Sequence, residues 1–343
     1  MISFLAIVFT FSLVIFVHEL GHFIFAVKSG VSVKIFSLGF GPELIGFTKN
    51  GVRYRLSAIP LGGYVEMKGQ SLEEEDALEP GSFMSLPPLK RIPILVSGAG
   101  MNFITGMIIL FFMFFTAGFY IHSNTAKVGG VMEGYPAVEA GFKENDRILS
   151  IGGEEVGSWD DVTEQISSRG GVETEFVLER GGEVFSVTAV PEFDPAKERG
   201  FMGITSPVEY IRPGFFRSIK ESVMLTYELC RGLLTFIGRM IIGSAPPDVS
   251  GPIGIAQAVS EAAGAGLAPL FQLIALISIQ LGFINLFPIP ILDGGHIVLS
   301  VLEKIKGGRL DAKKVMAANM VGIVLLLSLV LFASWQDLQR IFQ

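Results

Sequence analysis

Val14-Ile15-Phe16-Val17-His18-Glu19-Leu20-Gly21-His22-Phe23-Ile24-Phe25 is the stretch that decides the fold, because it places H-E-x-x-H inside an apolar run. On a helix, residues four apart lie one turn above each other. His18 and His22 can therefore offer both imidazoles to one metal ion, with Glu19 beside them. Ionisable groups at bilayer depth cost about 2.5 to 3.5 kcal/mol each and persist only with a partner or a function. The stretch predicts part of a hydrolytic zinc site within a membrane helix; two core histidines in a soluble helix, or a chance match, are the alternatives.

The composition excludes both an ordinary soluble protein and a bundle made only of spans. The chain has 343 residues, of which 50% are hydrophobic and 17% are charged. Its net charge of -7 is uneven, since residues 127–211 carry 17 acidic and 7 basic side chains and leave the remainder slightly basic. A membrane protein with an acidic soluble insert fits these values, and no segment resembles a nucleic-acid surface. Cys230 is the single cysteine, so no intramolecular disulfide is possible.

Four apolar segments are long enough to cross a hydrocarbon core of about 30 Å, which needs about 20 residues. The first lacks a basic start and a small-residue cleavage site, so we expect a retained span rather than a signal peptide. The predicted spans are residues 1–27, 92–120, 267–287 and 315–332.

A β-rich loop is predicted between the first two spans, over residues 32–67. Two alternating runs flank Lys49-Asn50-Gly51, which is a strong hairpin signal. The loop is also rich in glycine around Gly39-Phe40-Gly41, which indicates backbone that dips partly into the membrane. An exposed edge near these three residues is expected to pair with an extended substrate. A surface hairpin without a role in binding is the alternative.

The remaining segments divide the chain into four predicted parts. Residues 1–126 hold the first two spans and the hairpin, and residues 127–211 form an α+β insert. Residues 212–266 contain an amphipathic helix at the membrane surface followed by a linker, and residues 267–343 hold the last two spans.

Asp293 is the expected third metal ligand. It follows the end of the third span directly, after Asn285-Leu286-Phe287-Pro288-Ile289-Pro290, where the prolines break the helix. A catalytic zinc commonly keeps three protein ligands and one open position, and two histidines alone leave the set incomplete. A turn aspartate is the alternative. Asn102, inside the second span, is a candidate substrate-binding residue whose side chain either packs between helices or supports the site, whereas His122 and His296 are expected not to bind metal.

The distribution of Lys and Arg predicts the orientation. Residues 28–91 hold eight basic side chains and residues 304–314 hold five, whereas none precedes Lys28 and the tail has only Arg340. The positive-inside rule then makes these two loops cytoplasmic and the insert extracytoplasmic. The two histidines and Asp293 fall toward the cytoplasmic side.

Two resemblances cover nearly the whole chain. Residues 130–153 resemble a PDZ domain of the kind found in bacterial membrane proteases. H-E-L-G-H at 18–22, G-F-G at 39–41, P-L-G-G-Y-V at 60–65, G-P-I-G-I at 251–255 and N-x-x-P-x-x-x-x-D-G at 285–294 look like the site-2 protease family, of the bacterial RseP type. The resemblance implies a polytopic α-helical membrane protein with about four transmembrane helices, a membrane-associated β-hairpin loop and an inserted α+β PDZ domain.

The family implies intramembrane zinc proteolysis of single-span proteins, such as anti-sigma factors or remnant signal peptides, in the bacterial cytoplasmic membrane. The matching ligands are His18, His22 and Asp293, with Glu19 moving the proton and Asn285 and the hairpin holding the substrate. The PDZ domain then binds a peptide or substrate tail, or excludes bulky substrates. Two departures stand out: many relatives carry two PDZ domains, and many have A-G-P-x-x-N where this chain has S-G-A-G-M-N at 97–102.

Two other classes of function compete with the protease. A membrane scaffold would capture peptides with its PDZ domain and hold a structural metal, but it has no need of Glu19. A metal transporter would use the same ligands as a transit site, but the spans offer too few further ligands for a path. Substrate identity, the protease that acts first and the oligomeric state do not follow from the sequence.

Overall fold

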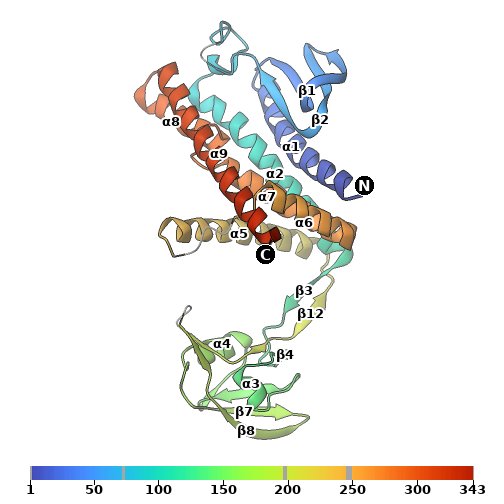
Figure 1. The fold of residues 1–343 in the computed structure, drawn as a ribbon, viewed down its shortest axis with the longest axis vertical. Helices are drawn as coiled ribbons and strands as arrows, with labels where there is room; N and C mark the ends of the chain where they lie inside the picture. The colour runs from blue at the N-terminus through green and yellow to red at the C-terminus, as the bar shows by residue number, and fades with distance from the viewer. Residues whose placement is uncertain (1, 72–73, 196–198, 245–248, 343) are drawn as a thin grey trace. The chain divides into compact units, whose positions relative to one another are not determined.

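The computed structural model describes residues 2–71, 74–195, 199–244 and 249–342 (Figure 1). They form two compact units, Met1–Phe115 with Gly214–Gln343 and Thr116–Pro213. The first unit contains α1 (Ile2–Lys28), β1 (Val33–Lys49), β2 (Val52–Met67), the 3-10 turn η1 (Phe83–Ser85), α2 (Pro88–Ala117), α5 (Phe215–Ile241), α6 (Pro252–Ala265), α7 (Leu267–Asn285), α8 (Asp293–Lys306) and α9 (Ala312–Phe342).

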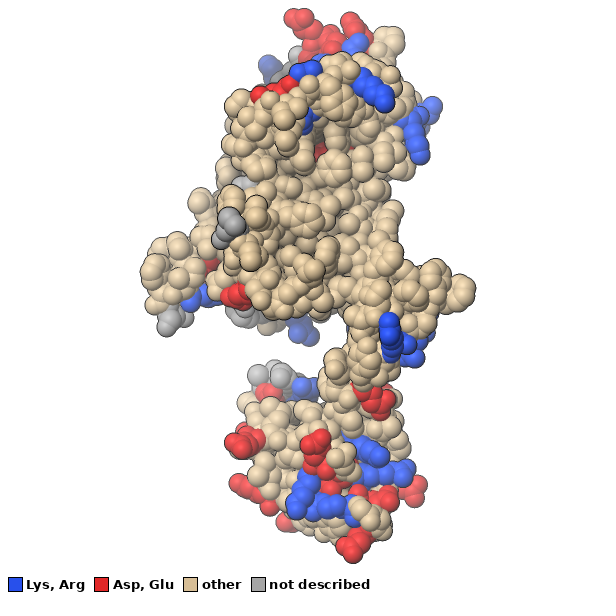
Figure 2. All heavy atoms as spheres, turned by 90° about the vertical axis from the view of Figure 1, so that its right-hand side faces the viewer, with Lys and Arg blue, Asp and Glu red and all other residues tan. Residues whose placement is uncertain are grey.

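Four helices of the first unit, α1, α2, α7 and α9, are long and apolar enough to cross a membrane. Figure 2 shows a wide band of this unit almost free of Lys, Arg, Asp and Glu, with charged side chains on both sides of the band. Small residues allow close helix crossings: a Cβ at Gly106 would lie 3.0 Å from Ile279 Cδ1, and one at Gly282 would lie 2.9 Å from the Ala99 oxygen. These glycines bring α2 and α7 together, and α2 lies directly beside the predicted metal ligands.

The predicted second span extends too far. We expected a helix to residue 120, but α2 ends at Ala117 because Gly118 takes a left-handed conformation with φ of 69°. The chain then continues as a strand, in which Tyr120 pairs with Tyr210.

The hairpin has the predicted turn, and it also folds back on itself. Asn50 and Gly51 both have positive φ, at 53° and 82°, which is the conformation of a type I′ turn. Beyond this turn, the first half of β1 pairs on two sides: Phe36 is opposite both Tyr54 and Val65. Residues 63–67 therefore form an outer row of the sheet. Figure 1 shows the hairpin at one end of the first unit and α5 across the opposite end.

Two α-helices of the first unit were not predicted. α6 lies within the predicted linker at residues 212–266, and α8 follows the proline-rich break. The α6 N-terminus has no capping side chain of its own, and Asp337 of α9 instead accepts hydrogen bonds from Gly251 N at 3.1 Å and Gly254 N at 2.8 Å. A cap that lies more than 80 residues away leaves no local signal in the sequence.

The second unit contains short strands around a small core. A four-stranded sheet has the order β6-β5-β7-β8, with α4 beside it, and β3 and β12 form a separate two-stranded ribbon. Its core includes the fully buried Phe176, Ile148 and Leu178. The elements are β3 (Phe119–His122), β4 (Gly130–Val131), α3 (Pro136–Glu139), β5 (Arg147–Ile151), β6 (Glu154–Glu155), α4 (Trp159–Ser167), β7 (Thr174–Arg180), β8 (Glu183–Ala189), β9 (Glu192–Asp194), β10 (Arg199–Phe201), β11 (Ile204–Thr205) and β12 (Val208–Ile211).

Candidate metal centre

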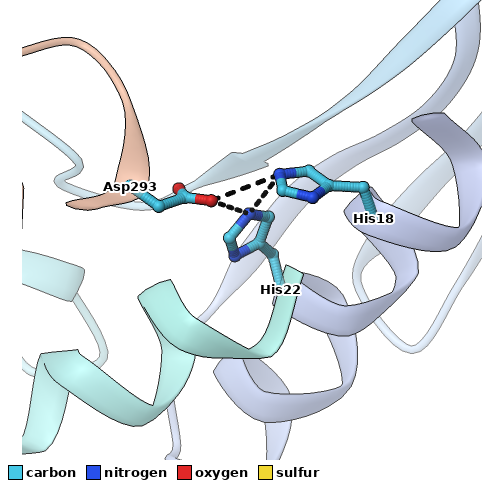
Figure 3. Close-up of side chains that lie close together, drawn as sticks. All are labelled: His18, His22 and Asp293. Carbon is cyan, nitrogen blue, oxygen red and sulfur yellow. Dashed lines mark hydrogen bonds and ion pairs between the residues drawn. The ribbon is translucent and has the colours of Figure 1, made fainter. Parts of the chain in front are cut away.

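Three side chains from two distant segments converge on one point. His18 Nε2 and His22 Nε2 lie 3.1 Å apart, and Asp293 Oδ2 lies 3.3 Å from the first and 3.4 Å from the second (Figure 3). Both histidines are buried, at 7% exposure. The helical spacing predicted for the histidines is present in α1, and the turn after α7 brings in the carboxylate.

Local backbone geometry places Asp293 at the first position of α8. The preceding segment contains Ile291 with φ of 79°, a left-handed conformation that a β-branched residue rarely adopts. Gly294 and Gly295 follow the aspartate, and a Cβ on either would overlap carbonyl groups of residues 286–289. The glycines therefore let the start of α8 lie against the turn, and the turn directs Asp293 toward α1.

The three donor atoms fit a zinc ion. Zinc binds imidazole nitrogen at about 2.0 to 2.1 Å in a tetrahedral arrangement, for which neighbouring ligand atoms lie about 3.3 Å apart. The observed separations of 3.1, 3.3 and 3.4 Å agree with that value. Asp293 Oδ2 is also buried without a hydrogen-bond partner among the described residues, which is costly for a carboxylate unless a cation lies there.

Helix α2 supports the far side of both rings. His22 Nδ1 lies 2.8 Å from the Ile94 carbonyl oxygen, which can only accept, so Nδ1 carries the proton and Nε2 is free to bind a cation. His18 Nδ1 lies 3.3 Å from Asn102 Nδ2. Gly98 lies between these contacts, directly against the two imidazoles.

Glu19 is held by the hairpin. Its Oε2 accepts a hydrogen bond from the Val65 backbone N–H at 3.1 Å, and the side chain is only partly buried. The bond connects the carboxylate to the outer row of the sheet, and Glu19 lines the cavity described next.

A cavity of about 470 Å³ surrounds these groups. Its lining combines polar groups with apolar side chains, as binding sites commonly do. Its lining includes Ile15, His18, Glu19, His22, Phe40, Gly63, Tyr64, Val65, Met67, Gln70, Phe83, Leu95, Leu281, Asn285, Ile291, Leu292, Asp293 and His296.

Some residues predicted to contact substrate line this cavity and others do not. Asn285 and Phe40 line it, and Asn285 Nδ2 lies 3.4 Å from His18 Nε2. Gly39 and Gly41 are not among the described lining residues; their φ values of 91° and 85° form the bend that presents Phe40. Asn102 is completely buried behind His18.

Sequence reasoning missed several lining residues. Tyr64 and Val65 belong to the motif at 60–65 but had been given no role of their own, and Gln70 belongs to no motif; all three line the cavity. His296 lines the cavity, but it is not part of the three-residue metal cluster. His122 lies in the second unit, with Nδ1 3.0 Å from Ser206 Oγ.

Comparisons with known proteins agree with this geometry. The model of Peptidase family M50 matches residues 6–329. The chain is 34% identical over 359 residues to "Putative zinc metalloprotease Atu1380" of Agrobacterium fabrum, which covers 96% of this chain and 94% of the relative. It is 32% identical over 385 residues to "Metalloprotease MmpA" of Caulobacter vibrioides, covering 99% and 96%. Among solved structures, the PDZ domain of an SdrC-like protein from Listeria monocytogenes matches with 20% identity and a TM-score of 0.22, covering 25% of this chain and 90% of that one, a score that carries no inference.

Proposed function

Because this chain belongs to peptidase family M50 and is a metalloprotease, we propose that it cleaves membrane-spanning segments of single-span proteins in a bacterial cytoplasmic membrane. The observation that carries the proposal is the placement of His18 and His22 on α1, which is itself long and apolar enough to be a span. Such a ligand pair favours a substrate that lies in the bilayer. Anti-sigma factors and remnant signal peptides are substrates of this kind.

Zinc is the proposed cofactor, bound by His18, His22 and Asp293. When bound, it supplies a Lewis acid that polarises a water molecule and the scissile carbonyl. Glu19 accepts the proton of the attacking water and passes it to the leaving amine. Its hydrogen bond from the Val65 N–H fixes one oxygen and orients the other for that transfer.

The substrate is proposed to lie along the outer row of the hairpin sheet. Residues 63–67 pair with β1 on one side, and Gly63, Tyr64, Val65 and Met67 line the cavity. An extended peptide placed there recovers backbone hydrogen bonds that it loses on unwinding. We therefore propose residues 63–67 as the pairing edge, in place of the edge near Gly39-Phe40-Gly41. Phe40 is proposed to contact the substrate through its side chain. Asn285 is proposed to bind the substrate backbone.

The second unit is proposed to be a PDZ domain on the extracytoplasmic side that binds a peptide or substrate tail. A groove of about 200 Å³ lies between α4 and β10 of this unit. Val162 and Ile166 of α4 face Phe201 and Met202 across it, an apolar arrangement suited to an extended peptide end. The basic loops at residues 28–91 and 304–314 support the cytoplasmic side for the metal centre.

The first test compares the parent with Glu19→Gln for cleavage of a tagged single-span substrate in membranes. We expect Glu19→Gln to lower cleavage by a factor of about 10² to 10⁴ with zinc content unchanged, because the proton acceptor is lost. The matched control is Glu261→Gln, which changes an exposed glutamate of α6. This variant should cleave the substrate normally. Removal of the metal with a chelator should abolish cleavage, and added zinc should restore it. Normal cleavage by zinc-loaded Glu19→Gln would refute the proposal.

A further inference from the structure

Asn102 lies in the wall behind the metal centre with an unsatisfied oxygen. Its side chain is completely buried in α2, and Oδ1 has no hydrogen-bond partner among the described residues. Its Nδ2 lies 3.3 Å from His18 Nδ1. Leaving a buried amide oxygen unpaired is costly, because it has lost its hydrogen bonds to water, so this group requires a partner.

The chemistry of His18 identifies that partner. A neutral imidazole has one N–H, and when Nε2 binds a cation the proton must be on Nδ1. His18 Nδ1 is enclosed by α2, so its N–H needs an acceptor inside the protein. The amide of Asn102 is the polar group that lies against it.

We propose that Asn102 is a positioning residue that accepts the His18 Nδ1–H through Oδ1. A rotation of 180° about the side-chain Cβ–Cγ bond exchanges the positions of Oδ1 and Nδ2 and turns the oxygen toward the ring. The resulting hydrogen bond pairs Oδ1 with the His18 Nδ1–H. It fixes the tautomer in which Nε2 faces His22 and Asp293.

The arrangement around His22 is equivalent. There the carbonyl oxygen of Ile94, which lies earlier in α2 than Asn102, accepts a hydrogen bond from His22 Nδ1 at 2.8 Å. The backbone of Asn102 is itself held, because Ser278 Oγ of α7 donates to its carbonyl oxygen at 2.9 Å. α2 thus provides one acceptor for each ring, and α7 keeps the second acceptor in place.

Two substitutions separate positioning from packing. Asn102→Leu keeps the approximate volume and removes the acceptor, whereas Asn102→Asp keeps an acceptor oxygen and adds a charge. The inference rests on the proposed zinc site and predicts that Asn102→Leu weakens zinc binding by about 10-fold to 100-fold, with Asn102→Asp within about threefold of the parent. A packing role predicts the reverse order, since a buried charge is the more disruptive change.

Zinc dissociation constants of the full chain in detergent, measured by competition with a chelator, provide the first readout. Asn319→Leu is the matched control, because Asn319 Oδ1 is also buried without a partner but the residue lies in α9 outside the metal cluster. It should bind zinc like the parent.

Nitrogen chemical shifts of ¹⁵N-labelled histidine in the metal-free chain give the second readout, and the sequence has only four histidines to assign. We expect His18 to carry its proton on Nδ1 in the parent and in Asn102→Asp, and to populate Nε2–H in Asn102→Leu. Parent-like affinity and an unchanged tautomer in Asn102→Leu would overturn the inference. Neither measurement uses a substrate, so a chain that binds zinc normally and cleaves nothing contradicts the proposed function alone.

Discussion

At the scale of single residues, Gly98 shows how little space separates α2 from the metal centre. A Cβ at this position would lie 2.7 Å from His22 Cε1 and 2.8 Å from His18 Cε1. We expect Gly98→Ala to displace the rings and to weaken zinc binding at least about tenfold, the lower end of the effect of disturbing a ligand's support. Chelator competition measures the change.

Gly100 provides the control for this prediction. It lies two residues further along α2, and a Cβ there meets no atom within 4 Å. Gly100→Ala should therefore bind zinc like the parent and gain slightly in helix stability. Equal weakening in both variants would show that helix α2, rather than contact with the imidazoles, controls zinc binding.

At the scale of elements, a buried ion pair connects α2, which lies against the two histidines of α1, with α8, which begins at Asp293. Arg91 Nη1 of α2 donates to Glu303 Oε2 of α8 at 2.8 Å, and both side chains are 4% exposed. Asp293 begins α8, so the pair holds the helix that carries the proposed third ligand. Glu303→Gln or Arg91→Met should lower the free energy of unfolding by about 3 to 5 kcal/mol, because each leaves one charge buried without its partner.

Denaturant unfolding in detergent tests that prediction, with Arg217→Met as control. Arg217 pairs with Glu221 on the exposed surface of α5, where such pairs contribute at most about 0.5 kcal/mol. If Glu303→Gln unfolds like the parent, the ion pair does not secure α8.

The helices and strands differ in how far the sequence alone could predict them. Strong local patterns predicted the four long apolar helices and the Asn50-Gly51 turn, because each depends on residues close together in the chain. α6 and the second pairing of β1 were not predicted. The residue that caps α6, Asp337, and the residue that pairs with β1, Val65, are both distant in sequence from their partners. The spacing of His18 and His22 predicted that they lie together. That Tyr64 lines the cavity and that Asn102 is buried depends on contacts that form only in the folded chain.

At the scale of the whole molecule, the second unit has a stability of its own that depends on pH. Burial raises the pKa of Asp146, but hydrogen bonds from Arg180 and from the Lys143 N–H, with the Arg180 charge, outweigh it and lower that pKa below its usual value. The pair therefore stabilises this unit fully above the unfolded pKa of about 3.9, and the contribution is lost as pH falls through the folded pKa.

Asp146→Asn should destabilise the second unit by about 1 to 3 kcal/mol at neutral pH, because the hydrogen bonds to a charged group are weakened. Amide hydrogen exchange of β5 and β7 in the full chain measures this loss. The difference from the parent should shrink in strong acid, and Glu183→Gln, at the exposed start of β8, should show no loss. A difference that stays constant down to strong acid would contradict the assignment to this carboxylate.

The paired strands β3 and β12 have a consequence for how this chain can change over generations. Phe119 lies opposite Ile211, so the backbone leaves and returns at neighbouring points. Whatever sequence stands between the two strands, the helices on either side keep their order and direction. A lineage can therefore lengthen, duplicate or discard the second unit without changing the order of the helices that precede and follow it.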